Sequence, residues 1–203
     1  MALQDLVVLV ADKNMQFALQ GVLARPQALG IRPVTYVFRP HMGRDGGVRS
    51  TGAELLASEA RRFRHALMVL DFHGCGREDE SPLMLEATLD LDLQAAWGER
   101  AKALVIVPEV DVWLWGADNA LRESLDWSQN TPIRDWLRVR GFEFGIDGKP
   151  RMPKEAMQLI CREQKRPRSS ALYERITKRI SLKHCTDPAF GRLRGQLSAW
   201  FRV

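Results

Sequence analysis

Four acidic residues lie at the ends of stretches that the sequence predicts to be β-strands. Asp12 closes the first such stretch and Asp71 the third, and the fourth runs through Pro108 into Glu109 and Asp111. In a parallel sheet the carboxyl ends of the strands meet at one edge, so these carboxylates are expected to lie close together. Carboxylates that converge repel one another unless a cation lies between them, and Mg²⁺ prefers oxygen ligands. The spacing therefore predicts a Mg²⁺ site, although Asp12 is equally well explained as the N-cap of the next helix.

The residues after Asp71 include further groups that could bind a ligand or take part in a reaction. On an extended chain His73 faces the same way as Asp71 and could be a metal ligand, or it could be a loop histidine bonded to backbone. Gly74 and Gly76 could form a backbone nest that binds phosphate, or only a tight turn. Cys75 has no base partner that the sequence identifies, so a role as nucleophile is disfavoured.

The elements that must position these groups alternate between strand and helix. Apolar or alternating stretches at residues 5–12, 31–38, 66–71 and 103–107 predict four strands. Helical spacing at 14–24 and 51–63, and a helix from Ser81-Pro82 to about residue 97 or 98, predict the connections. This order is typical of an α/β fold with a mainly parallel, Rossmann-like sheet of about four strands flanked by helices.

Beyond Pro108 the pattern changes to short helices. They are expected at 110–116, 118–125 and 132–140 and, after a turn at 145–150, at 154–163, 170–180 and 188–201. Trp113 and Trp115 are expected to pack in the core or at a seam. Residues 41–47, with Arg44 near their centre, are expected to form a flexible loop after the second strand. The predicted division is an α/β domain at 1–116 and a basic helical region at 117–203 packed on it.

Basic residues are concentrated toward the end of the chain. Residues 148–203 contain 14 Lys and Arg against 4 Asp and Glu, a net charge of +10, whereas residues 1–147 have a net charge of −5. Such a split indicates nucleic-acid contact, and it fits equally well a solvated surface or one that docks on an acidic partner. The residues expected to hold a nucleic-acid backbone are Lys165, Arg166, Arg168, Arg175, Lys178 and Arg179.

Other features concern the compartment. No apolar run approaches the roughly 18 residues that a membrane span requires, and the apolar start of the chain is interpreted as a strand and not as a signal peptide. The 3 cysteines (Cys75, Cys161 and Cys185) are odd in number and widely spaced. This pattern disfavours a disulfide scaffold and favours a reducing cytoplasm. The lack of a long apolar run predicts that the protein does not associate with a membrane.

Several stretches resemble a known family. VLVADKNMQFALQGVL, LDFHGCG and VIVPEVDVWLWG look like the TOPRIM-type fold, the Mg²⁺-binding α/β domain of topoisomerases, primases and OLD-family nucleases. The chain is similar to small, stand-alone TOPRIM-like proteins of bacterial anti-phage operons, in particular to the TOPRIM-like component of methylation-associated defence systems. MPKEAMQ, SSALYERI and ISLKHCTDPAFGRLRGQLSAWF also resemble that group, so the likeness spans most of the chain.

The resemblance assigns roles position by position. It implies that Asp12 replaces the TOPRIM glutamate and that Gln16 replaces a second acid of some relatives. Asp71 and His73 fall on the paired acids after the third strand, where the second acid has become histidine. The final acidic segment falls on Glu109 and Asp111. Fewer carboxylates bind Mg²⁺ more weakly, and histidine favours a softer ion such as Mn²⁺.

Two functions follow from these expectations. The first is a divalent-metal-dependent nuclease or other phosphoryl-transfer enzyme acting on DNA or RNA, with Asp12, Asp71 and Glu109 catalytic. Its metal ligands would be Asp12, Asp71, His73, Glu109 and Asp111. The second is a catalytically degenerate scaffold or nucleic-acid-binding subunit, which the departures at Gln16 and His73 favour. Lys154 could neutralise charge near the metal or could be an ordinary surface residue. The expected partners are nucleic acid and proteins of the same defence operon, and the sequence also allows a homodimer.

Overall fold

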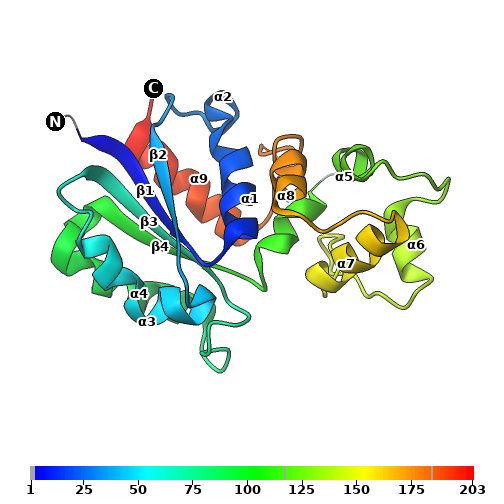
Figure 1. Ribbon diagram of the computed structural model, residues 1–203, viewed down its shortest axis with the longest axis horizontal. Helices are drawn as coiled ribbons and strands as arrows, with labels where there is room; N and C mark the ends of the chain where they lie inside the picture. The colour runs from blue at the N-terminus through cyan, green and yellow to red at the C-terminus, as the bar shows by residue number, and fades with distance from the viewer. Residues whose placement is uncertain (1–2, 117, 184) are drawn as a thin grey trace.

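The computed structural model of the protein describes residues 3–116, 118–183 and 185–203. At its centre is an all-parallel sheet of four strands, which confirms the predicted α/β class (Figure 1). The strand order is β2-β1-β3-β4, and the strands are β1 (Gln4–Val10), β2 (Tyr36–Pro40), β3 (Phe63–Asp71) and β4 (Ala101–Ile106). The order reverses between β1 and β3, and α/β sheets bind ligands outside the carboxyl ends of the strands at such a switch point.

The two central strands form the core of the sheet. In β1, residues 6–10 are buried, and in β3 residues 66–70 are buried. Their registers pair Val8 with Leu67, and β3 in turn pairs Val69 with Leu104 of β4. Strands covered on both faces have no exposed side to mark with polar residues. This explains why the sequence shows continuous apolar runs there instead of strict alternation.

Helices cover both faces of the sheet (Figure 1). On one face lie α1 (Lys13–Leu23) and α9 (Pro188–Phe201), with the short α2 (Pro26–Leu29) nearby. On the other lie α3 (Arg44–Ala57) and α4 (Pro82–Trp97). The indole N–H of Trp97 donates to the backbone oxygen of Leu56 at 3.1 Å, which joins α4 to α3. Because α9 lies on the sheet, the last helix of the chain belongs to the α/β domain.

The outer edge of β4 is closed by side chains. A carboxylate oxygen of Glu86 accepts from the backbone N–H of Val105 at 2.8 Å, and Asp90 accepts from that of Ala103 at 2.7 Å. Arg192 of α9 pairs with both oxygens of Glu86, at 2.8 and 2.9 Å, and also donates to the backbone oxygen of Val105 at 3.1 Å. The edge groups of β4 that would otherwise lack strand partners are thus satisfied by charged residues.

The helices α1 and α8 (Ser170–Thr177) pack closely on each other and join the sheet domain to the rest of the chain. A Cβ on Gly21 would lie 2.0 Å from Oγ1 of Thr177 and 2.8 Å from the backbone oxygen of Glu174. Only glycine fits at that position. Arg25 donates to the backbone oxygens of Thr177 and Ile180, at 3.1 and 2.6 Å, and so satisfies carbonyls at the C-terminal end of α8.

The remaining elements form an extension beside the sheet (Figure 1). They are the 3₁₀ helix η2 (Val110–Trp115) and the helices α5 (Asp118–Leu125), α6 (Ile133–Arg138) and α7 (Pro153–Glu163); a further 3₁₀ turn, η1 (Gly98–Arg100), precedes β4. Trp113 and Trp115 are buried, as predicted, and Trp113 donates to Asp187 at the start of α9 at 2.9 Å. Within the described residues, no helix has both the length and the apolar character to cross a membrane.

Two predicted elements differ from the structure. The strand expected at 31–38 begins only at Tyr36, and Ile31 makes an isolated antiparallel bridge with Arg202 instead. The helix expected at 51–63 begins at Arg44 and ends at Ala57, so the flexible loop predicted at 41–47 is wrong in its second half. The adjacent glycines at 46 and 47 suggested a loop, but both lie within the helix, and the ring of His41 packs on Gly47. A Cβ there would lie 2.3 Å from the ring of His41.

Candidate functional site

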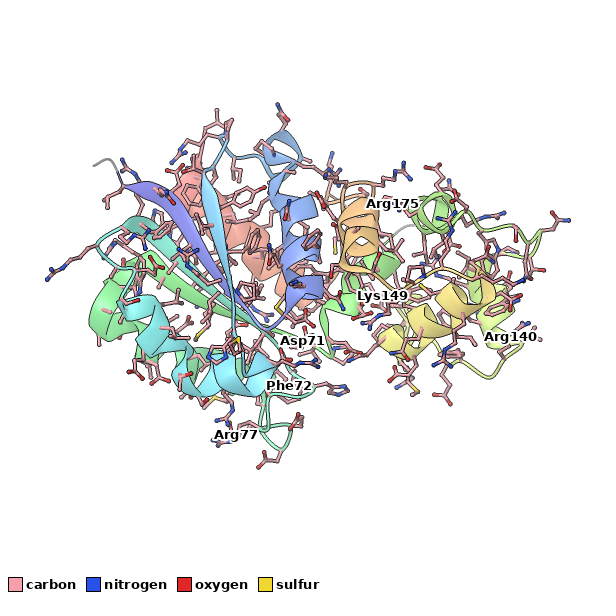
Figure 2. All side chains as sticks on the ribbon, viewed as in Figure 1. Asp71, Phe72, Arg77, Arg140, Lys149 and Arg175 are labelled. Atoms are coloured by element: carbon pink, nitrogen blue, oxygen red, sulfur yellow. The ribbon has the colours of Figure 1, made fainter. Side chains whose placement is uncertain are left out.

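Each strand of the sheet leads into a carboxyl group at the same edge. Asp12 follows β1, Asp45 lies in the first turn of α3 after β2, and Asp71 ends β3. Glu109 and Asp111 follow β4, at the start of η2. We call these five residues the acidic rim. Figure 2 shows Asp71 at the end of the sheet, on the side that faces the extension.

Backbone groups hold three members of the acidic rim in place. Oδ1 of Asp12 accepts from the N–H of Met15 at 2.9 Å, which confirms Asp12 as the N-cap of α1. Oδ1 of Asp45 accepts from the N–H of Asp71 at 2.7 Å, and Oδ1 of Asp71 accepts from the N–H of Val110 at 2.7 Å. These bonds tie the end of β3 to α3 on one side and to η2 on the other. The carboxylates therefore have fixed positions relative to the sheet.

Burial and neighbouring carboxylates raise the pKa of Asp71 and of Asp45. Burial raises the pKa of Asp71 well above its usual range, and the charges of Asp45, Glu109 and Asp111 raise it further, against the lowering effect of the Val110 N–H. The pKa of Asp45 is raised by burial and by the charge of Asp12. Shifts with these two causes are typical of carboxyls that lie near one another in a poorly solvated place. A cation bound among them would remove the repulsion.

Two rim members already have cationic partners. Glu109 is buried and accepts from Nζ of Lys154 at 2.8 Å, which partly offsets the effect of burial in raising its pKa. Asp111 is buried, lies 3.0 and 3.1 Å from Nη2 of Arg168 and accepts from the hydroxyl of Tyr173 at 2.6 Å. The structure thus places Asp111 in a buried ion pair that fixes the segment before α8 against η2.

His73 lies outside the acidic rim. It is exposed, whereas Asp71 is half-buried, and the carboxylate that its charge influences is that of Glu78. The nest suggested by the glycine spacing is formed: the N–H groups of Gly74 and Gly76 both donate to Oε1 of Glu78, at 2.7 and 3.3 Å. Cys75 is buried, and burial raises the pKa of its thiol, which does not favour a thiolate nucleophile.

The rim does not form a ready coordination shell. Among residues 3–116, 118–183 and 185–203, no three His, Cys, Asp or Glu side chains are grouped as metal ligands. The donor chemistry suits a hard divalent ion, since all five groups are carboxyls. A bound ion would have to draw Asp12, Asp45 and Asp71 closer to one another, and at Glu109 it would compete with Lys154, which is bonded to Oε2.

The predicted nucleic-acid-binding residues do not form one surface. Arg168 is committed to Asp111, and Arg166 pairs with Asp126. Nη1 of Arg175 donates to the backbone oxygen of Ser124 at 3.3 Å, and Lys178 pairs with Glu174 at 2.6 Å. The positions of the six along the chain differ as well: Lys165, Arg166 and Arg168 precede α8, whereas Arg175, Lys178 and Arg179 lie in its last turn or beyond.

The course of α8 separates these two groups. Its start lies near the acidic rim, because Ser170 donates to the side chain of Asn14 in the first turn of α1 at 2.8 Å. Its end lies beside Arg25, at the far end of α1. Lys178 and Arg179 are therefore about one helix length, roughly 12 Å, further from the rim than Ser170. Lys165 and Arg166, both exposed, lie in the connection between α7 and α8.

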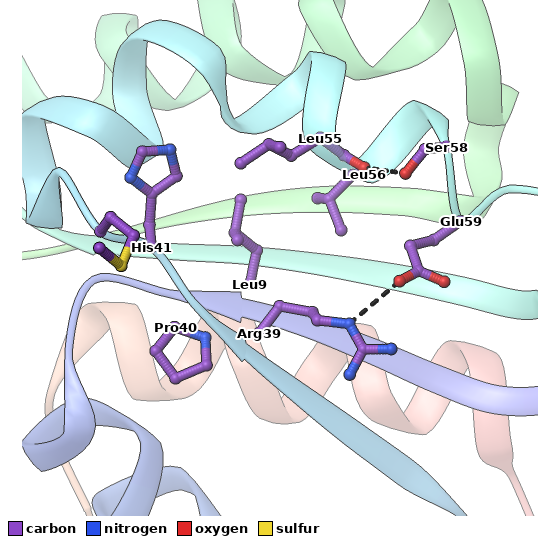
Figure 3. A pocket seen from close by; sticks show the side chains of 9 residues that line it. Leu9, Arg39, Pro40, His41, Leu55, Leu56, Ser58 and Glu59 are labelled. Atoms are coloured by element: carbon purple, nitrogen blue, oxygen red, sulfur yellow. Dashed lines mark hydrogen bonds and ion pairs between the residues drawn. The ribbon is translucent and has the colours of Figure 1, made fainter.

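A pocket of about 350 Å³ lies beside the carboxyl end of β2 (Figure 3). Its walls are mainly apolar and include Leu9, Pro40 and Leu56, and the ion pair between Arg39 and Glu59, at 3.0 Å, lines one side. None of the five rim residues lines this pocket. It is thus a separate feature from the acidic rim.

Sequence reasoning missed Asp45. The predicted site used acids that directly follow three apolar runs, and Asp45 lies five residues beyond the end of β2, next to two glycines. The signal was present, because an acid in the first turn of the helix after a parallel strand lies at the same edge as the strand end. It was hidden by the expectation of a loop at 41–47.

Comparisons with models of protein families, with curated proteins and with solved structures find no match for the chain. The function is therefore argued from the site.

Proposed function

We propose that the protein is a divalent-metal-dependent phosphoryl-transfer enzyme acting on nucleic acid, with the acidic rim as its metal site. The supporting observation is Asp71 at the switch point of the sheet, where burial and then the charges of Asp45, Glu109 and Asp111 raise the pKa of its carboxyl. Carboxylate oxygens are donors that suit Mg²⁺ or Mn²⁺. The resemblance of the sequence to TOPRIM-like proteins of anti-phage operons supports the same chemistry and a role in defence.

The residues of the chain have separate tasks in this proposal. A bound ion would activate water and stabilise charge on the phosphate oxygens. Asp12, Asp45 and Asp71 would hold it, each oriented by the backbone bond already in place. Lys154, half-buried beside Glu109, would present a positive charge to the phosphate. Because the pKa of Asp71 is raised, binding of the ion releases protons, and the affinity for the ion increases with pH.

Nucleic acid is the proposed substrate because of charge. The last quarter of the chain has a net charge of +10, and Lys165 and Arg166 are exposed in the connection before α8, whose start lies near the rim. Contacts of this kind bind the phosphate backbone with little sequence preference. The proposal therefore includes cleavage without a defined recognition sequence.

Plasmid nicking tests this function. Supercoiled plasmid and single-stranded DNA are incubated with the protein and Mg²⁺ or Mn²⁺, with Asp71→Asn as the site variant and Asp92→Asn, an exposed acid of α4, as the matched control. The wild type and the control are expected to nick the plasmid, and the rate of nicking by Asp71→Asn should be lower by about 100-fold or more. Mn²⁺ should also raise the Tm of the wild type and the control but not that of Asp71→Asn. If the wild type cuts nothing with either ion, the enzyme proposal fails.

A second candidate is a catalytically degenerate scaffold or nucleic-acid-binding subunit of a multi-protein defence system. The observation that favours it is the neutralisation of Glu109 by Lys154 and of Asp111 by Arg168, together with the lack of a grouped ligand set among the described residues. This reading predicts a DNA gel shift that persists in EDTA and fades with salt, without metal-dependent nicking. The two candidates thus differ in the same pair of assays.

A further inference from the structure

The loop after β3 is an anion-binding nest filled by a carboxylate of the protein itself. Gly74 and Gly76 have φ angles of +93° and +77°, which L side chains rarely adopt and which let their N–H groups converge. Both N–H groups donate to one oxygen, Oε1 of Glu78, at 2.7 and 3.3 Å. Glu78 is exposed, so its carboxylate reaches the nest from the solvent side.

An arginine and a histidine lie beside this nest. Arg49 of α3 donates through Nε to the backbone oxygen of Cys75 at 2.7 Å, and its Nη2 lies 3.9 Å from the position of a Cβ on Gly76. The N–H groups of the loop lower the pKa of Glu78, and the exposed His73 lowers it further. The surroundings thus favour a negative charge at the position that the Glu78 carboxylate occupies.

The fit of Glu78 to the nest is incomplete. A single oxygen serves two donors, and the bond from Gly76 is long at 3.3 Å. A phosphate group has several oxygens and more charge, so it can give each N–H group its own acceptor and still contact Arg49 or His73. Displacement of Glu78 requires only rotation of an exposed side chain, with no change in the fold.

We propose that this nest is a phosphate-binding site, and that Glu78 is an internal competitor that a phosphate group must displace from the N–H groups of Gly74 and Gly76. The nest begins three residues after Asp71, and Oδ2 of Asp45 lies 3.8 Å from the position of a Cβ on Gly74. A phosphate in the nest would therefore lie next to the acidic rim. The inference stands without the proposed metal chemistry, because the nest is formed by backbone groups and needs no ion.

The test measures phosphate binding in EDTA, so that its outcome is independent of metal-dependent nicking. Inorganic phosphate is titrated into ¹⁵N-labelled protein, and the amide signals of Gly74 and Gly76 are followed by NMR. Glu78→Ala removes the competitor, Glu78→Gln removes its charge, and Asp79→Asn, the neighbouring exposed acid, is the matched control for charge alone.

When Glu78 occupies the nest for about nine-tenths of the time, its removal raises the apparent affinity of the nest for phosphate about tenfold. Glu78→Ala should therefore tighten the Kd for phosphate about tenfold, Glu78→Gln should tighten it less, and Asp79→Asn should change it by less than about twofold. No shift of the Gly74 and Gly76 signals in Glu78→Ala would overturn the proposal, and so would an equal gain in Asp79→Asn.

Two oligonucleotides that differ only in a 5′-phosphate show whether the nest binds a terminal phosphate or a backbone diester. Tighter binding of the 5′-phosphorylated strand to Glu78→Ala, seen at the same two amide signals, assigns the site to a terminal phosphate. Equal binding of both strands assigns it to a backbone diester. If neither strand shifts the two amide signals, the site does not serve nucleic acid, and the proposal for this substrate class is overturned.

Discussion

Gly21 is a position where one added methyl group should measurably weaken the protein. It lies in α1 where α8 crosses at close range, and this helix pair connects the sheet to the second half of the chain. In Gly21→Ala the new Cβ would lie 2.0 Å from Oγ1 of Thr177 and 2.8 Å from the backbone oxygen of Glu174. Real Cβ atoms essentially never lie within 3.0 Å of such atoms, so α8 has to move.

The size of the effect follows from two opposing terms. Thr177 can rotate its hydroxyl away, but that breaks its buried hydrogen bond to the backbone oxygen of Tyr173 at 2.9 Å, and the backbone oxygen of Glu174 cannot rotate. Overpacking of this kind costs about 1–3 kcal/mol, and the loss of the hydroxyl bond adds about 1 kcal/mol. The better helix propensity of alanine returns about 1 kcal/mol. The net expectation is a loss of about 2 kcal/mol.

Gly195→Ala is the matched control. Gly195 lies inside α9 and is exposed, and a Cβ there would meet nothing within 4 Å. The same chemical change should therefore stabilise the protein by about 0.4–1 kcal/mol. In thermal or urea unfolding, Gly21→Ala should lower the Tm by roughly 4–8 °C, while Gly195→Ala should raise it by about 1–4 °C. A rise in Tm of similar size in both variants would refute the close approach of α1 and α8.

The remaining predictions concern charge. The folded protein holds the proton of Asp71 more tightly than the unfolded chain does, so this residue makes the stability of the metal-free protein fall as the pH rises above about 4. In urea unfolding with EDTA, Asp71→Asn should show a smaller fall with pH and a free energy of unfolding higher by about 0.5–2 kcal/mol at neutral pH. An unchanged pH profile would contradict the electrostatics of the rim. Arg192→Ala leaves the buried carboxylate of Glu86 without its cation and should cost about 3–5 kcal/mol in the free energy of unfolding, so a loss below about 1 kcal/mol would argue against the ion pair at the β4 edge. Arg168→Gln should lower the Tm because it breaks a buried pair, whereas Lys165→Gln should leave the Tm unchanged and reduce the salt slope of DNA binding by about 1; the reverse pattern would mean that Arg168 contacts nucleic acid.

Local patterns in the sequence were enough to predict the sheet and its edge. The apolar runs that contain Val8 and Val69 are continuous because both strands are buried on two faces, and the chain direction of parallel strands then places the following acids together. The Ser81-Pro82 start of α4 was also predicted from local chemistry. These features depend on residues close to one another in the chain.

The rest depends on contacts between distant residues. Asp111 pairs with Arg168, 57 residues later, so the sequence could not show that these two residues form an internal ion pair. Asp45 was missed because its adjacent glycines suggest a loop, whereas Gly47 lies inside a helix and packs on the ring of His41. The nest at Gly74 was suggested by glycine spacing alone, but its occupation by Glu78 required the loop geometry.

The treatment of the sheet edges limits how copies of the protein can associate. A strand approaching β4 would have to displace Glu86 and Asp90 from the N–H groups of Val105 and Ala103, and would leave Arg192 without its partners. The β4 edge is therefore closed to strand addition. A continuous sheet shared by two copies has to form through β2, at the opposite end of the strand order, so any such dimer is a single pair and cannot grow into a fibre through its edges.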